Sequence, residues 1–85
     1  MKPLIYKYTI MPGDKLTLHI PREDIVVHVG KDTRSDDPAM WIMHRPGGVA
    51  VDRTFYVVPT GHRFDGSYKG TAICGEFAWH IAEAV

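Results

Sequence analysis

The segment with the clearest potential for binding lies where an apolar run ends in a sharp turn. Val57 and Val58 lead into Pro59, and the polar residues 60–63 follow as Thr-Gly-His-Arg. Proline ends a strand because it has no N–H to donate, and glycine permits the positive φ of a tight turn. A turned strand end is a usual place for binding loops. The same residues also fit a purely structural turn, in which Thr60 bonds locally and His62 caps the turn.

This turn has the chemistry to hold an anion or the carbonyl groups of a partner. An imidazole and a guanidinium both donate hydrogen bonds, and the guanidinium is always charged. Tyrosine and tryptophan are favoured anchors at interfaces, and so small a domain cannot bury all of its aromatic side chains. The predicted ligand- or partner-binding residues are Thr60, Gly61, His62, Arg63 and Tyr68.

Five histidines raise the question of a metal site, but their spacing does not favour one. Metal-binding pairs usually lie a few residues apart on one element, whereas these histidines are far apart in sequence. Convergence of His19, His28 and His80 across strands stays open as an alternative. We otherwise expect no metal ligands and no cofactor.

The sequence lacks a recognisable catalytic constellation. Cys74 has no evident oxyanion hole or orienting partner, and a free cysteine is usually buried. Asp36 and Asp37 follow no calcium-loop pattern, and Gly47-Gly48 is not followed by the residues of a phosphate loop. We therefore expect no enzyme activity, with a small hydrolase or metal-dependent enzyme as the least favoured alternative.

Charge and length exclude further classes. Ten Lys and Arg residues balance ten Asp and Glu residues, which argues against nucleic-acid binding because phosphate contacts need a basic patch. The N-terminal stretch has no long apolar run, so we expect no secretory signal, no membrane anchor and a cytoplasmic location. Residues 1–85 form one domain, too small for a doubly wound nucleotide fold. Its thin core and single cysteine favour a homo-oligomer.

The elements that must position these residues are predicted to be short strands. Turn residues recur at short intervals, and the segments between them are rich in β-branched and aromatic residues. The predicted strands are 4–10, 15–20, 25–29, 39–44, 49–58, 68–74 and 77–82. The predicted fold is all-β, a small antiparallel sandwich or open barrel of about six to seven strands. Helical spacing of Phe77, Ile81 and Val85 leaves a short C-terminal helix as an alternative.

Local patterns add predictions about these strands and the loops between them. Alternation along 15–20 places His19 on the solvent face, and 39–44 is apolar on both faces, as in a central strand. Pro46-Gly47-Gly48 predicts a hairpin into 49–58, and Gly75 predicts a second hairpin. Residues 32–38 have no apolar anchor, which is typical of a mobile, solvated loop.

Three motifs make the chain similar to a family of small bacteriophage and prophage proteins of unknown function. They are Thr60-Gly61-His62, Tyr-x-Gly-Thr at 68–71 and Phe-x-Trp-His at 77–80, and the resemblance covers nearly the whole chain. The chain differs at Pro59, where the family commonly has glycine, and this proline lacks the N–H that a phosphate-binding nest would use. The resemblance implies a phage origin and a cytoplasmic host setting, and it brings no known activity.

The sequence therefore leads to one function and one main alternative. Our prediction is a non-enzymatic phage accessory protein that binds a host protein through exposed aromatic residues and an edge strand. The alternative is a homo-oligomer that binds a small anionic ligand with His62 and Arg63.

Overall fold

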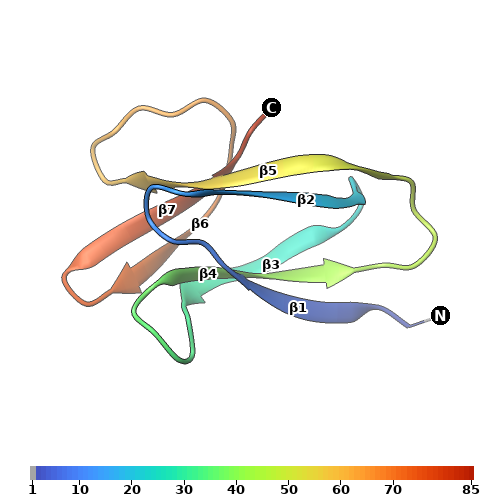
Figure 1. Ribbon diagram of the computed structural model, residues 1–85, viewed down its shortest axis with the longest axis horizontal. Coiled ribbons are helices and arrows are strands. Elements are labelled where there is room, and N and C mark those ends of the chain that lie inside the picture. Colours follow the sequence, from blue (N-terminus) through green and yellow to red (C-terminus); the bar gives the residue numbers. More distant parts are fainter. Residues whose placement is uncertain (1) are drawn as a thin grey trace.

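Seven antiparallel strands form two sheets in a computed structural model that describes residues 2–85 (Figure 1). In chain order they are β1 (Leu4–Thr9), β2 (Lys15–Pro21), β3 (Ile25–Lys31), β4 (Pro38–His44), β5 (Ala50–Pro59), β6 (Ser67–Cys74) and β7 (Phe77–Glu83). The strand orders are β1-β4-β3 and β2-β5-β7-β6. The sheets form an open sandwich, not a closed barrel, so the predicted all-β fold is confirmed. The last element is strand β7, and the helical alternative is wrong.

The core lies between the two sheets and uses one face of each strand. Met40 and Ile42 of β4 are fully buried, as are Phe55 of β5 and Ile81 of β7. Because side chains alternate along a strand, the neighbours of these residues point to the outer faces. His19 of β2 is exposed, as its alternation predicts.

β4 is the central strand of the three-stranded sheet, as predicted from its apolar sequence. Met40 and Ile42 on its inner face are fully buried, whereas Trp41 and Met43 on the outer face are only half-buried. The prediction that β4 is covered on both faces is therefore met only in part, because the four-stranded sheet packs against one face alone.

The hairpin predicted at Pro46-Gly47-Gly48 is wrong. β4 already pairs with β1 on one side and β3 on the other, so it has no free edge for β5. The turn instead carries the chain from one sheet to the other. The hairpin at Gly75 is confirmed, because β6 pairs with β7 and Gly75 has a φ of 61°.

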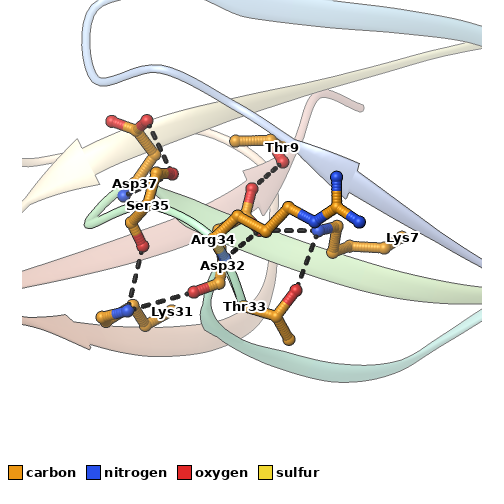
Figure 2. Close-up of polar contacts among 8 residues, drawn as sticks. All are labelled: Lys7, Thr9, Lys31, Asp32, Thr33, Arg34, Ser35 and Asp37. Carbon is orange, nitrogen blue, oxygen red and sulfur yellow. Dashed lines mark hydrogen bonds and ion pairs between the residues drawn. The ribbon is translucent and has the colours of Figure 1, made fainter.

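The turn between β3 and β4, predicted as a mobile, solvated loop without an apolar anchor, has a polar anchor at Asp32. Asp32 is buried, and its carboxylate accepts hydrogen bonds from Lys7 Nζ at 2.6 Å and Thr9 Oγ1 at 2.5 Å (Figure 2). The N–H of Arg34 donates to the same carboxylate at 3.1 Å. The anchor is polar, so a search for apolar residues does not find it.

Candidate functional site

A small pocket lies where the loop after β5 meets β6 and β7. Its volume is about 210 Å³. It is lined by Val58, Pro59, Gly61, His62, Phe64, Tyr68 and His80. The loop that forms one wall arches from the end of β5 to the start of β6 (Figure 1).

The turn that starts this loop has the predicted form. β5 ends at Pro59, Gly61 has a φ of 90°, and the N–H of His62 donates to the Pro59 carbonyl at 3.2 Å. Thr60 differs from the prediction of a local bond. Its hydroxyl bonds across the sheet to β7, donating to the Ala78 carbonyl at 3.2 Å. The turn is thereby tied to the strand that supplies the pocket floor.

Strand register places the floor of the pocket on the outer face of the four-stranded sheet. His80 follows Trp79 and precedes the buried Ile81, so its side chain points away from the core. His80 is the partner of Val58 on β5 and of Thr71 on β6. These three residues therefore lie side by side beneath the loop.

A chain of hydrogen bonds passes through the His80 ring. Nε2 lies 2.8 Å from Thr60 Oγ1, and Nδ1 lies 2.7 Å from Thr71 Oγ1. The Tyr68 hydroxyl lies 2.6 Å from the same Thr71 oxygen. The chain thus links the turn after β5 to the exposed ring of Tyr68.

The direction of this chain follows from counting protons. The single Thr60 proton goes to the Ala78 carbonyl, so His80 Nε2 must carry a proton and donate to Thr60. In the neutral ring, Nδ1 then accepts from Thr71, and Tyr68 donates to Thr71. The phenol oxygen of Tyr68 is left with its acceptor capacity free. The chain therefore offers an incoming group an acceptor.

Four of the five predicted residues belong to this arrangement, and one does not. Gly61, His62 and Tyr68 line the pocket, and Thr60 belongs to the hydrogen-bond chain. Arg63 lines a separate depression with Tyr56, Phe64 and Asp65. Its guanidinium is therefore not among the groups that line the pocket.

Sequence reasoning missed His80, Thr71 and Phe64 as parts of this site. His80 and Thr71 belong to the motifs Phe-x-Trp-His and Tyr-x-Gly-Thr, so a signal was present. Alternation with the apolar Ile81 indicates that His80 points outward. Only the strand register shows that Thr60 and Thr71 flank it.

A second polar cluster lies at the opposite end of the sandwich. Asp24 is buried and accepts hydrogen bonds from the Arg45 N–H at 3.0 Å and His44 Nδ1 at 2.7 Å. Burial alone would raise the pKa of Asp24, but these donors hold it below its ordinary value. His44 Nε2 lies 2.7 Å from the Tyr8 hydroxyl.

This arrangement runs from the Asp24 carboxylate through the His44 imidazole to the Tyr8 phenol. An ionised Asp24 fixes the proton on His44 Nδ1, so Nε2 accepts from the Tyr8 hydroxyl. Burial, followed by the neighbouring Tyr6 and Asp24, raises the pKa of Tyr8. The hydrogen bonds of this cluster tie β1 to the end of β4.

The histidines do not gather around one point. Within residues 2–85 there is no group of three His, Cys, Asp or Glu side chains that could hold a metal ion. His19 pairs instead with Asp52 at 2.9 Å on the solvent face. The same part of the chain contains no helix with the length and apolarity needed to cross a membrane.

Fold and site together define a small all-β sandwich domain with a shallow pocket on one outer face. The chain belongs to the family described as a domain of unknown function (DUF7352), whose model matches residues 1–85. This agrees with the prediction of a family of unknown function, and the phage setting stays a prediction. Comparisons with curated proteins and with solved structures found no match.

Proposed function

We propose that this protein is a non-enzymatic binding module that recognises another protein through the pocket beside Tyr68. The observation that carries this proposal is that the pocket is small and that exposed aromatic side chains lie beside it. Its volume of about 210 Å³ is below the roughly 300–1,000 Å³ of small-molecule sites. Phe64 and Tyr68 stand exposed beside it. A recess with aromatic neighbours suits one anchor side chain of a partner protein.

The hydrogen-bond chain narrows the chemistry of that anchor. The Tyr68 oxygen offers an acceptor, while Val58, Pro59 and Phe64 supply apolar walls. An anchor with an apolar body and one N–H or O–H donor therefore complements the pocket better than a carboxylate does. The resemblance to phage proteins makes a cytoplasmic protein of the bacterial host the partner we propose.

Two aromatic variants test this proposal. Wild-type protein, Tyr68→Ala and Phe77→Ala are immobilised in turn and exposed to host-cell lysate, and retained proteins are identified by mass spectrometry. Phe77 is 60 % exposed against 57 % for Tyr68, and it lies outside the pocket lining, so Phe77→Ala is a matched control. We expect Tyr68→Ala to lose a stoichiometric companion that Phe77→Ala retains, with affinity reduced about tenfold or more.

The same experiment contradicts the proposal if no companion is retained, or if Tyr68→Ala retains it as well as wild type. Tyr68→Phe separates the two parts of the argument, because it keeps the ring and removes only the hydroxyl. Partial loss with Tyr68→Phe is the expected result.

The anionic-ligand alternative has less geometric support. Of its two residues, His62 lines the pocket but Arg63 lies outside it, and Tyr68 offers an acceptor. It predicts a rise in melting temperature with inorganic phosphate or nucleotides, and Arg63→Ala would remove that rise. We expect neither compound to change the melting temperature.

A further inference from the structure

β1 forms an outer edge of the three-stranded sheet (Figure 1). It exposes three apolar residues in succession. Leu4, Ile5 and Tyr6 are 52, 54 and 57 % exposed. Side chains alternate, so Leu4 and Tyr6 lie on one face of the strand and Ile5 lies on the other. An exposed, apolar edge strand is a template for pairing with another chain unless something blocks it.

The lysine of this strand does not block the edge. Lysines protect edges because their ammonium groups need water there. Lys7 Nζ is instead 2.6 Å from Asp32 Oδ1 and 3.2 Å from Thr33 Oγ1, both in the turn after β3 (Figure 2). The side chain therefore lies across its own sheet, and its charge is neutralised there.

The backbone of β1 also has groups available at this edge. Ile10 N–H donates to the Pro38 carbonyl at 3.0 Å, and the register of β1 against β4 is regular. Bonded and non-bonded pairs alternate along an antiparallel ladder. By this alternation, the N–H and C=O groups of Ile5, Lys7 and Thr9 point away from β4. The free edge thus has both donors and acceptors.

We propose that β1 pairs antiparallel with β1 of a second copy of this chain, around a two-fold axis at Ile5. In this register Ile5 faces Ile5 of the second copy, and Leu4 faces Tyr6 on the other side of the sheet. The exposed apolar residues thereby cover one another, and the outward backbone groups of Ile5 bond to their equivalents. The three-stranded sheet of one copy and that of the second copy become one continuous six-stranded sheet.

The pairing of Lys7 favours this register over those with the axis at Tyr6 or Lys7. An axis at Lys7 would place two lysines directly opposite each other, which destabilises a strand pair. An axis at Tyr6 would place Lys7 opposite Ile5 of the second copy. An axis at Ile5 places Lys7 opposite Pro3, whose carbonyl accepts the Lys7 N–H. A second copy is the partner we infer because the strand complements itself on both faces, as a two-fold interface requires.

The first test is the mass of the assembly in solution. Wild-type protein, Ile5→Lys and Ile73→Lys are compared by analytical ultracentrifugation up to about 100 µM, where even a micromolar Kd gives mostly dimer. Ile73 is the matched control, because it is 64 % exposed but lies on β6 of the other sheet. We expect wild type and Ile73→Lys to be dimers and Ile5→Lys to have half their mass. A monomeric wild type, or a dimeric Ile5→Lys, overturns the proposal.

The second test is the register. Opposed Cα atoms of a bonded pair are about 5.5 Å apart, within the range of a disulfide. Ile5→Cys is therefore expected to cross-link on mild oxidation, whereas Tyr6→Cys is not, because its nearest copy lies diagonally at about 7–8 Å. Cys74 is the one native cysteine and is buried. Preferential cross-linking of Tyr6→Cys overturns the axis at Ile5. This interface uses a different sheet from the Tyr68 pocket, so either proposal can fail alone.

Discussion

Buried charged side chains in this protein fix the ends of strands to one another. Arg53 of β5 donates two hydrogen bonds to the Glu83 carboxylate at 2.7 and 2.8 Å. It also donates to the Pro21 and Asp24 carbonyls, each at 2.8 Å. A buried charge is costly unless it is paired and hydrogen-bonded. Within residues 2–85, every buried side-chain nitrogen and oxygen has a partner.

Asp32 provides a prediction about pH. Hydrogen bonds from Lys7 and Thr9, and then from the Arg34 N–H, hold the pKa of Asp32 well below its usual value. Its stabilisation is therefore present above the unfolded pKa of about 3.9 and is lost as the pH falls toward the folded pKa. We expect Asp32→Asn to lower the free energy of unfolding at neutral pH, with a smaller difference from wild type in acid. Guanidinium denaturation at several pH values measures this.

Asp36→Asn is the control for that prediction, since Asp36 lies in the same turn with its side chain 82 % exposed and 3.9 Å from Lys31 Nζ. We expect this variant to match wild type at each pH. An equal effect of the two substitutions would show that the turn is not anchored through Asp32.

The strands of this fold could be predicted from the sequence, whereas of their pairing only the β6–β7 hairpin could. Period-two alternation and turn residues are local, and they located all seven strands. The turn at Gly47 shows why pairing is harder. Local turn chemistry is the same whether the chain forms a hairpin or crosses to another sheet. The outcome depends on β1 and β3, which occupy both edges of β4.

The site was partly predictable, because some of its residues are adjacent in sequence and others are brought together only by strand pairing. Thr60, Gly61 and His62 are adjacent, so their turn was evident from the sequence. His80 is 20 residues from Thr60, and only the register of β5 against β7 brings them within 2.8 Å. Arg63 was placed with His62 by adjacency, but it lines a different depression.

β3 and β6 belong to different sheets and approach each other closely at Gly70. A Cβ atom added at Gly70 of β6 would lie 2.6 Å from the Val29 Cβ of β3. This distance is far below van der Waals contact, and the nearest atom is close to the backbone. We expect Gly70→Ala to lower the free energy of unfolding by about 1–3 kcal/mol, measured by guanidinium denaturation.

Gly47→Ala measures the backbone cost of replacing a glycine without a steric clash. Gly70 has a φ of 158°, so Gly70→Ala carries a backbone cost as well as the clash, and it is expected to be the more destabilising of the two. Gly47 has a φ of 92°, and a Cβ added there would meet no atom within 4 Å. Its substitution therefore costs about 1–2 kcal/mol from conformation alone. If Gly70→Ala were neutral, the two sheets would not be in the close contact that the structure gives them.

The whole molecule is thin, with extents of 40 × 28 × 16 Å. Such a shape gives each sheet one outer face and leaves little volume for a core between them. The Tyr68 pocket lies on the outer face of the four-stranded sheet, whereas the free edge of β1 belongs to the three-stranded sheet. A dimer formed at β1 would therefore leave both pockets open, and each copy could bind a partner.

The rate at which a thiol reagent labels the buried Cys74 measures how often this thin core opens. Cys74 is 3 % exposed, and burial raises the pKa of its thiol, so both access and thiolate formation are reduced. Ile73 is the adjacent residue on the opposite face of β6 and is 64 % exposed. We expect a thiol reagent to label Cys74 at least about a thousandfold more slowly than the added thiol of Ile73→Cys, because labelling of Cys74 requires opening of the core. Gly70→Ala should accelerate labelling of Cys74 in proportion to its loss of stability and leave the rate at Ile73→Cys unchanged. Equal labelling of the two positions in the wild-type background would mean that the sheets separate readily without global unfolding.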